Sequence, residues 1–418
     1  MLTSPQLRFK EFTSEWSTHS SKIKIVAGNA YPLSKYGTRG ALLVQGQNIF
    51  PNQLKIEEPV YIPDEYLNGN DVWISRGDIL LGLNRPLLGK RLKTCQFRHD
   101  TPAVLYQRAG KLVFNTEKLV ADFLYQYLFS GTFLRQLSAE LVGSDQPYIK
   151  SDLFNVTKNK FPDVAEQQKI AAFLTAVDTK IEQLTQKEAL LKQYKKGVMQ
   201  KIFSQEIRFK ADDGSEFPEW NLVAIGETVD KSVRWSLTGG PFGSDLKSAD
   251  YTDEGVRIIQ LQNIGDGKFL DDYAIYTSSE KADQLLACNI YAGEIIISKM
   301  GDPVARCCLM PETSNRYLMA SDGIRYVPDS KFYNKEYLFQ YINYKDFRKQ
   351  AFENSTGSTR KRIGLSDLKA LKISAPIKEE QDKIASFLDA LDKSIDGVLY
   401  QLNAAKTFKK GLLQQMFV

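Results

Sequence analysis

The sequence predicts an α+β protein in which one unit, a globular block followed by a long helix, is present twice. Three observations carry this prediction: a repeat at a separation of about 214 residues, short β-type runs in two blocks, and two apolar stripes at helical spacing. At 418 residues the chain is also longer than one ordinary domain, and the usual domain size predicts two or three cores.

The repeat extends through the whole chain. Matched segments occur in the helical parts, in the blocks and in the short leading parts: Glu166–Leu174 with Glu380–Leu388, Tyr194–Phe203 with Phe408–Phe417, Ser151–Leu153 with Ser366–Leu368, Gln47–Ile49 with Gln262–Ile264, and Leu7–Lys10 with Ile207–Lys210. The repeat divides the chain into a leading segment (1–16), a first block (17–160), a first helical segment (161–206), a second leading segment (207–220), a second block (221–375) and a second helical segment (376–418).

The two helical segments are predicted from the spacing of their apolar residues. In the second segment these residues alternate in steps of four and three from Ile384 to Ala405, which is the seam of a coiled coil. The first segment has a similar stripe, interrupted by Glu188 and Lys195. One such stripe fits the core of any helical bundle, whereas two of equal length favour helices that pack on each other. Helices of about 38 residues span about 57 Å, which exceeds one turn of DNA at about 34 Å.

The two blocks are predicted to contain mixed α and β structure. Each contains one aromatic-rich helical stretch, at Leu119–Leu137 and at Lys335–Phe352. Short apolar runs bounded by Gly, Asn and Asp are typical of strands and turns, and they include Ala41–Val44, Asp78–Leu81, Arg257–Ile259 and Glu294–Ile297.

Composition excludes several classes of protein. With 43% hydrophobic and 25% charged residues the chain is typical of folded soluble proteins, and no stretch approaches the roughly 18 apolar residues of a membrane span. The first sixteen residues have no apolar core, so we expect no secretory signal and a cytoplasmic protein. The four cysteines have no CxxC spacing and only two histidines are present, so we expect no metal site, no cofactor and buried apolar roles for the cysteines.

Sequence motifs of nucleic-acid enzymes are missing. There is no Gly-rich cofactor loop, Asn/Asp-Pro-Pro-aromatic tetrapeptide, Walker A loop, HExxH helix or nuclease carboxylate–lysine cluster. Gly301–Pro303 lacks the second proline and the aromatic residue, and it is interpreted as a turn. His19 and His99 have no matching place in the other repeat, so a surface or core role is favoured over that of a general base. The sequence therefore predicts a protein without catalytic residues.

Polar loops punctuated by glycine carry side chains suited to DNA. Gln, Asn and Arg can form paired hydrogen bonds with base edges, while Lys, Ser, Thr and backbone amides suit phosphate oxygens. In the second block the candidates are Ser244, Lys247, Gln260, Gln262, Asn263, Lys299, Ser358, Thr359, Arg360, Lys361 and Arg362. In the first block they are Gln45, Gln47, Asn48, Arg85, Lys90, Arg91, Ser144, Gln146 and Tyr148.

These candidates have competing structural interpretations. For Arg360–Arg362 we favour phosphate contact over a solvated run of charges. The triplets Gln47–Ile49 and Gln262–Ile264 recur in both blocks, so a structural turn is the stronger interpretation for their polar residues. For any one Gln or Asn, base contact and a purely structural role are equally supported by residue type.

The order of the segments resembles a known family. Each variable block is followed by Ser-Asp-Leu, a proline-containing bridge, a helix start such as Glu166–Ala171 and a Lys-Lys-Gly helix end. This order, present twice, is similar to the specificity subunit of type I restriction-modification enzymes along essentially the whole chain. Gly240–Ser244 and Leu261–Ile264 resemble the openings of its target recognition domains. The resemblance implies two α/β target recognition domains in a pseudo-twofold repeat, separated by two long antiparallel coiled-coil helices.

The resemblance also implies partners. Each recognition domain would read one half of a split, asymmetric target in double-stranded DNA, and the helices would dock two modification subunits that bring S-adenosylmethionine and methylate adenine. A restriction subunit, a motor and nuclease, can join for cleavage, and no membrane partner is implied. Two other classes remain open: a coiled-coil adaptor that binds proteins instead of DNA, and a fused enzyme with an unrecognised active site.

Overall fold

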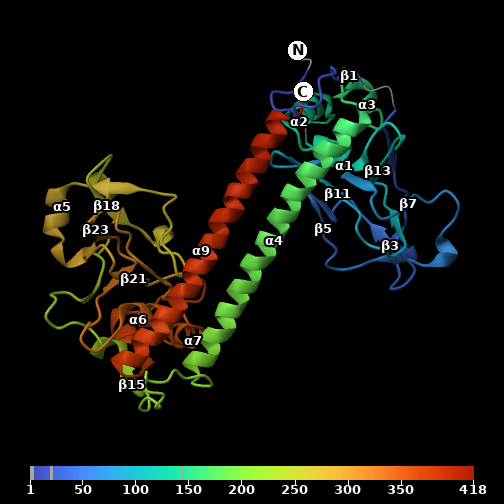
Figure 1. The fold of residues 1–418 in the computed structure, drawn as a ribbon. Coiled ribbons are helices and arrows are strands. Elements are labelled where there is room, and N and C mark those ends of the chain that lie inside the picture. Colours follow the sequence, from blue (N-terminus) through green and yellow to red (C-terminus); the bar gives the residue numbers. More distant parts are fainter. Residues whose placement is uncertain (1–3, 19–21, 144) are drawn as a thin grey trace. The chain divides into compact units, whose positions relative to one another are not determined.

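The chain folds into two compact units that divide within its two longest helices. The computed structural model describes residues 4–18, 22–143 and 145–418. Unit 1 comprises Met1–Gln186 and Leu399–Val418, and unit 2 comprises Lys187–Val398. The dividing points fall inside helix α4 (Val164–Phe203) and helix α9 (Lys378–Gln415), so each unit contains part of both helices (Figure 1). Both helices lie within the segments predicted to be helical.

Unit 1 is built on two four-stranded sheets. The first has the order β11 (Thr94–Gln96), β8 (Ile79–Gly82), β13 (Ala109–Val113), β2 (Lys24–Ala27), and the second has the order β6 (Tyr61–Ile62), β3 (Ala41–Val44), β12 (Ala103–Leu105), β7 (Trp73–Ile74). Three strand pairs accompany them: β1 (Ser17–Thr18) with β14 (Lys160–Phe161), β4 (Ile49–Phe50) with β5 (Gln53–Leu54), and β9 (Leu87–Leu88) with β10 (Arg91–Leu92). The short helices are α1 (Ala121–Tyr127), α2 (Gly131–Glu140) and α3 (Leu153–Val156), with 3-10 turns at Leu33–Lys35 and Asp64–Tyr66.

Unit 2 repeats the two main sheets of unit 1, with one extra strand in the second sheet. Its sheets have the orders β16 (Leu237–Gly239), β24 (Gly323–Tyr326), β21 (Ile295–Ser298), β22 (Cys307–Leu309), and β17 (Tyr251–Thr252), β19 (Ile275–Thr277), β18 (Val256–Ile259), β23 (Arg316–Met319), β20 (Asn289–Tyr291). The pair β15 (Asn221–Ala224) and β25 (Lys372–Ala375) corresponds to β1 and β14. The helices are α5 (Ser279–Gln284), α6 (Lys335–Ile342), α7 (Lys345–Glu353) and α8 (Leu365–Ala370), with 3-10 turns at Ile225–Glu227, Ser248–Asp250, Leu261–Asn263 and Leu286–Cys288.

Strand register confirms that the two units are copies of one fold. In each unit two strands pair in parallel within an otherwise antiparallel sheet, β3 with β12 and β18 with β23. Val44 faces Leu105 in unit 1, and the matching positions Ile259 and Met319 face each other in unit 2. Equal register matters because a slip of one residue would exchange the buried and exposed faces of a strand. The α+β prediction and the internal repeat are therefore confirmed.

The aromatic-rich stretches predicted as helical each form two helices. In unit 1 the stretch is divided at Ser130, whose hydroxyl oxygen accepts a hydrogen bond from the Phe133 backbone N–H and so caps helix α2. In unit 2 the division falls at Tyr344, between α6 and α7. The apolar periodicity continued across both divisions, and it did not indicate where the chain turns.

Helices α4 and α9 pack side by side and antiparallel within each unit (Figure 1). In unit 1 Lys409 contacts the carboxylate of Asp178 at 2.5 and 2.7 Å, and in unit 2 Lys195 contacts Asp392 at 2.6 and 2.7 Å. Each aspartate also accepts a hydrogen bond from a glutamine of its block, Gln126 or Gln340. These contacts match at the offset of 214 residues, so each block is joined to both helices in the same way.

The leading segments are attached to the helix starts by buried ion pairs. In unit 1 Arg8 donates to both carboxylate oxygens of Glu166 at 2.7 Å, and the Glu166 side chain is fully buried. In unit 2 Arg208 donates to Glu380 at 3.2 and 2.7 Å, and Trp220 donates its indole N–H to the same carboxylate at 3.0 Å. The hydrogen bond to Glu166 raises the pKa of Arg8, and Glu380 has the same effect on Arg208.

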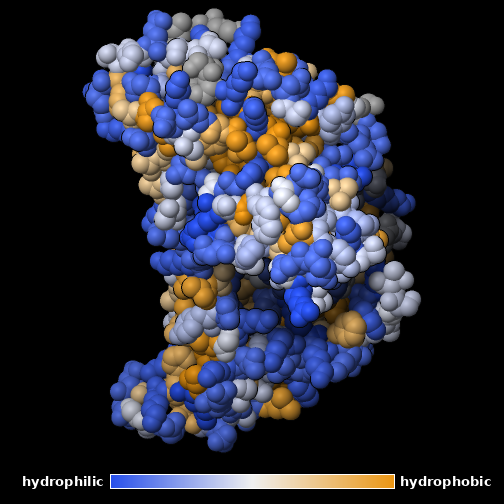
Figure 2. Space-filling model, turned by 90° about the vertical axis from the view of Figure 1, so that its right-hand side faces the viewer, coloured by the Kyte–Doolittle hydropathy of each residue, from blue (hydrophilic) through white to orange (hydrophobic). Residues whose placement is uncertain are grey.

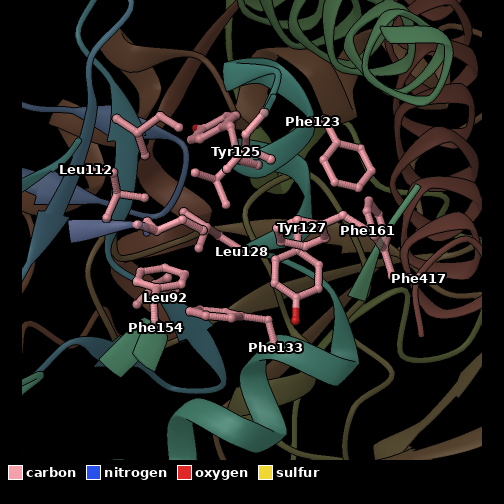
Figure 3. Close-up of a cluster of buried hydrophobic side chains, with 14 of the residues drawn as sticks. Leu92, Leu112, Phe123, Tyr125, Tyr127, Leu128, Phe133, Phe154, Phe161 and Phe417 are labelled. Carbon is pink, nitrogen blue, oxygen red and sulfur yellow. The ribbon is translucent and has the colours of Figure 1, made fainter. Parts of the chain in front are cut away.

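The core of unit 1 gathers side chains from its block and from the C-terminal end of the chain. Figure 3 shows Phe417 beside Phe161 and Phe123, with Phe133 and Phe154 stacked against each other. The Phe123 and Phe161 rings meet edge to face at 5.3 Å between centroids, a favoured aromatic geometry. On the face drawn in Figure 2, hydrophilic residues predominate and hydrophobic residues form smaller patches.

Three features of the structure concern expectations drawn from composition: the cysteines, the helices and the possible metal ligands. All four cysteines are buried and free, as predicted, and burial raises the pKa of the Cys95 thiol to about 12. Within residues 4–18, 22–143 and 145–418, no helix is both long and apolar enough to cross a membrane. The same residues contain no group of three or more His, Cys, Asp and Glu side chains placed to hold a metal ion. His19 lies outside the described residues.

Candidate nucleic-acid interface

The two Gln-Asn turns have the same hydrogen bonds in both units. In unit 2 the Asn263 side chain accepts from the Gln260 backbone N–H at 3.0 Å and donates to the Leu270 carbonyl at 3.0 Å. In unit 1 the Asn48 side chain accepts from the Gln45 backbone N–H at 2.8 Å and donates to a backbone carbonyl at 3.1 Å. Asn263 is 1% exposed. Both asparagines therefore hold the turns, as the structural interpretation of these residues expects.

The glutamines of these turns remain accessible. Gln262 donates to the side-chain oxygen of Gln260 at 3.3 Å, and Gln47 donates to Gln45 at 3.2 Å. Gln47 and Gln262 are exposed, while Gln45 and Gln260 are half-buried. Each turn thus presents a pair of carboxamides whose remaining donors and acceptors are free to bind a ligand.

A second pair of equivalent loops contains the basic run of unit 2. In unit 2 Thr356 and Arg362 form a two-way backbone bridge, each N–H bonding to the other's carbonyl at 2.9 Å. In unit 1 Val142 and Tyr148 form the same bridge. Gly357 (φ +96°) and Gly143 (φ +94°) occupy the same place in the two loops, in a backbone conformation that favours glycine.

This equivalence pairs residues that look unrelated in sequence. Tyr148 of unit 1 corresponds to Arg362 of unit 2, and Gln146 corresponds to Arg360. The first loop thus offers an amide and an aromatic hydroxyl where the second offers cations. Ser144, also expected in this loop, lies outside the described residues.

A third loop connects these elements and differs in length. Backbone bonds from Ile149 to the Leu83 carbonyl and from Ile363 to the Lys299 carbonyl mark its starts as equivalent. It then runs from Leu83 to Thr94 in unit 1 and from Lys299 to Cys307 in unit 2, so it is three residues longer in unit 1. The additional length forms the β9–β10 hairpin, and Arg85, Lys90 and Arg91 are exposed on this loop.

In unit 2 the equivalent loops enclose a cleft of about 960 Å³. Its wall is formed by the loop after β16, the Gln-Asn turn, the loop after β21, the end of β23 and the loop after α7. The lining residues are Pro241, Phe242, Gly243, Leu246, Tyr251, Gln260, Leu261, Gln262, Met300, Gly301, Asp302, Arg306, Ala320, Ser321, Asp322, Phe352, Ser358, Thr359, Arg360 and Lys361.

One wall of the cleft is cationic and aromatic. The Lys361 ammonium lies over the Phe352 ring at 4.7 Å from its centroid, a favourable cation–π contact. Arg360 is exposed, and no ion pair involving it is present among the described residues. Arg306 also lines the cleft, but it donates to the Ile264 and Leu261 carbonyls at 2.5 and 3.1 Å and so supports the Gln-Asn turn.

Two further charged residues lie beside the cleft and are held by the fold. Lys299 donates to the Ser321 carbonyl at 3.0 Å, and burial, reinforced by the nearby Arg362, lowers the pKa of Lys299. Arg362 lies 3.3 Å from a carboxylate oxygen of Asp322, an ion-pair contact without hydrogen-bond geometry. These contacts hold the two cations against Ser321 and Asp322, which line the cleft.

The structure gathers about half of the unit 2 residues predicted as DNA contacts. Six of them line the cleft, and they are Gln260, Gln262, Ser358, Thr359, Arg360 and Lys361. Ser244 and Lys247 are exposed on the loop after β16, Lys299 and Arg362 contact the lining residues Ser321 and Asp322, and Asn263 is buried. Sequence reasoning missed Phe242, Phe352 and Arg306 as lining residues. Phe242 stands between Pro241 and Gly243, outside any apolar periodicity, and this isolation was the available signal.

The chemistry of the cleft suits a polyanion with polar edges. Cations and hydroxyls on one wall can bind phosphate oxygens, and the carboxamides of Gln260 and Gln262 can form paired hydrogen bonds with a base. The fold and the cleft together define a class of protein with two copies of one α+β unit, each joining polar loops of similar construction to a pair of long helices.

Comparison with known proteins places the chain in a family. Residues 23–193 and 249–404 match the model of the type I restriction modification DNA specificity domain. The chain therefore belongs to the type I restriction-modification DNA specificity family. This confirms the resemblance inferred from the order of the repeated segments.

Individual relatives agree with this assignment. The chain is 31% identical over 204 residues to the type I restriction enzyme MjaVIII specificity subunit of Methanocaldococcus jannaschii, covering 48% of each protein. It is 26% identical over 247 residues to the putative type I restriction enzyme MjaX specificity subunit of the same organism, covering 57% of this chain and 53% of that protein. The chain thus spans about half the length of the curated relatives it matches.

A solved structure shares the fold. The type I restriction-modification system S subunit from M. genitalium matches with a TM-score of 0.58 at 14% identity, covering 99% of both chains. At this identity the match shows a common fold.

Proposed function

We propose that this chain is the sequence-specific DNA-recognition subunit of a type I restriction-modification complex. The observation that carries the proposal is the unit 2 cleft, which combines two carboxamides, hydroxyls and the cations Arg360 and Lys361 in a unit that the chain contains twice. Residues 17–160 and 221–375 are the proposed target recognition domains, each reading one half of an asymmetric bipartite target. The chain itself is non-catalytic, and partner subunits carry out adenine methylation and restriction.

The remaining predicted contacts fit the same role. In unit 1 we propose that Gln45, Gln47, Arg85, Lys90, Arg91, Ser144, Gln146 and Tyr148 contact DNA, and in unit 2 Ser244, Lys247, Lys299 and Arg362 add to the lining residues. The exposed cations among them suit phosphate contact, whereas the amides suit base edges.

The helices offer matched surfaces for partners. Tyr194 of α4 and Phe408 of α9 stand at equivalent positions in the repeat, and each is 54% exposed. Aromatic residues are enriched in protein interfaces, and these two occupy matching positions on the two helices. We propose that each aromatic residue docks one modification subunit, which gives two modification subunits per chain. A restriction subunit joins this assembly for cleavage.

Activity that depends on the partner tests the proposed function. The purified chain is expected neither to methylate nor to cleave DNA, and methyl transfer from labelled S-adenosylmethionine is expected once the modification subunit is added.

Native mass spectrometry is expected to show two modification subunits per chain, and Tyr194→Ala or Phe408→Ala each to remove one of them. Leu222→Ala, at a 66% exposed apolar residue of strand β15 and so outside helices α4 and α9, serves as the control. Label incorporated by the chain alone would contradict the non-catalytic assignment, and absence of DNA binding by the assembly would favour the protein-binding adaptor.

Exchange of one block tests whether the two domains read separately. Replacing residues 221–375 with the matching block of a relative of different specificity is expected to change one half of the methylated sequence and to leave the other half unchanged. The reason is that each block has its own sheets, core and loops. Sequencing of methylated adenines in a host that expresses the hybrid gives the result. A simultaneous change in both halves would show that neither block is an independent reader.

A further inference from the structure

Phe242 is an apolar side chain exposed at the rim of the cleft. Its exposed fraction is 83%, which is the highest of any exposed large hydrophobic residue among the described ones. The residue lies within the cleft lining, while the cations Arg360 and Lys361 lie on the loop after α7. Single exposed hydrophobic residues are common on protein surfaces, so the distinguishing feature of Phe242 is its place in the lining of a cleft that also contains cations and hydroxyls.

The loop that carries Phe242 is held in place at its base. The Gly240 backbone N–H donates to the Gly323 carbonyl at 2.9 Å, and a Cβ atom at Gly240 would lie 1.9 Å from the Ala320 carbonyl oxygen. Only glycine permits this approach of two backbone segments. Pro241 is buried, and the Phe242 carbonyl accepts a hydrogen bond from the Asp245 backbone N–H at 2.9 Å. The ring is thus presented by a turn with fixed backbone contacts.

The equivalent loop of unit 1 is shorter and turns its aromatic residue inward. Gly28 is the counterpart of Gly240, because its N–H donates to the Ala109 carbonyl at 3.0 Å and a Cβ atom there would lie 2.1 Å from the Leu105 carbonyl oxygen. From this glycine the loop runs to Tyr36 in unit 1 and to Tyr251 in unit 2, which makes the unit 2 loop three residues longer. Tyr31 in the shorter loop is buried and donates to Asp71 at 2.5 Å.

We propose that Phe242 inserts as a wedge between two adjacent base pairs of the half-site bound by unit 2, and so makes recognition of that half-site depend on how easily its DNA unstacks. Apolar wedges of this kind partly unstack a base step and kink the duplex, and flexible steps deform most easily. Arg360 and Lys361 would hold the backbone phosphates while the Phe242 ring enters the stack. The proposal rests on the proposed function, because it requires DNA in the cleft.

The test uses the full chain assembled with its modification subunits and a duplex containing the methylated target. 2-Aminopurine is placed at each successive position of the half-site assigned to unit 2 by block exchange, leaving out the adenine that becomes methylated. The wild-type complex is expected to raise the fluorescence several-fold at one step, and Phe242→Ala to return it to the level of free duplex. Affinity is expected to fall roughly tenfold, the order that base–aromatic stacking contributes, with an unchanged salt dependence because no cation is removed.

Two further variants separate a wedge from other roles. Phe242→Leu is expected to retain part of the fluorescence signal because leucine also serves as a wedge, whereas Phe332→Ala, at a 65% exposed aromatic residue outside the cleft lining, is expected to change nothing. Normal target binding without local unstacking, or a signal that persists in Phe242→Ala, would overturn the wedge and leave the proposed function intact. Loss of modification-subunit binding in Phe242→Ala with an unchanged DNA signal would assign the ring to a protein interface and also overturn it.

Discussion

Replacing Arg360, Lys361 and Arg362 with alanine is expected to lower the affinity of the assembled complex for its target by on the order of a hundredfold at low salt. Each cation that neutralises a phosphate releases a condensed counterion. The slope of log affinity against log salt concentration is therefore expected to become less negative by up to about 2.7 when the three cations are removed. Arg360 and Lys361 line the cleft, and Arg362 is 47% exposed beside Asp322. Fluorescence anisotropy over a range of salt concentrations gives both quantities.

A matched charge change elsewhere in unit 2 is the control. Lys331, Lys345 and Lys349 are exposed lysines outside the cleft lining, and their replacement by alanine removes the same charge. This variant is expected to retain most of the affinity and nearly the whole salt slope. Equal slopes for the wild type and the Arg360–Arg362 variant would show that the loop after α7 does not contact DNA phosphates. The solvated run of charges would then be the correct interpretation.

The fold could be predicted because the residues that form its helices and their contacts occur twice in the sequence at one offset. Pairs such as Asp178 with Asp392 and Lys195 with Lys409 stand at one offset, and in the structure each aspartate contacts the lysine that belongs to the other copy in sequence. The repeat therefore predicts both the presence of the two helices and their packing on each other. Two of the short apolar runs predicted as strands, Ala41–Val44 and Glu294–Ile297, coincide with β3 and with most of β21, because apolar runs of that length are buried in sheets.

The site could be predicted only in part, because its geometry depends on loops whose sequences differ. Arg362 and Tyr148 share one bridge in the backbone, yet no property of their side chains relates them. The side chains of Asn48 and Asn263 donate hydrogen bonds to carbonyls seven residues away, and these bonds require the folded turn. The two units also differ in loop length. Unit 1 has a longer loop before β11, and unit 2 has a longer loop after β16. Surface loops tolerate such insertions at a small cost in stability.

Removal of Arg208 is expected to destabilise unit 2 by about 3 kcal/mol, the range for breaking a buried ion pair by removing one partner. The fully buried carboxylate of Glu380 would keep only the Trp220 indole as a hydrogen-bond donor among its contacts with the leading segment. Hydrogen exchange, resolved by segment, measures the effect, and the loss is expected in the amides of unit 2. Arg8→Ala is expected to produce the same loss in unit 1, because Glu166 is equally buried.

Two controls show whether this loss comes from an unpaired charge. Glu380→Gln in the Arg208→Ala background is expected to restore part of the stability, because the amide carries no charge that must remain buried without a partner. Lys210→Ala removes a cation two residues away, whose partner Glu216 is 63% exposed, and is expected to change the stability of unit 2 by less than about 1 kcal/mol. If Arg208→Ala and Lys210→Ala had equal effects, the buried pair would not be what fixes the leading segment to the start of α9.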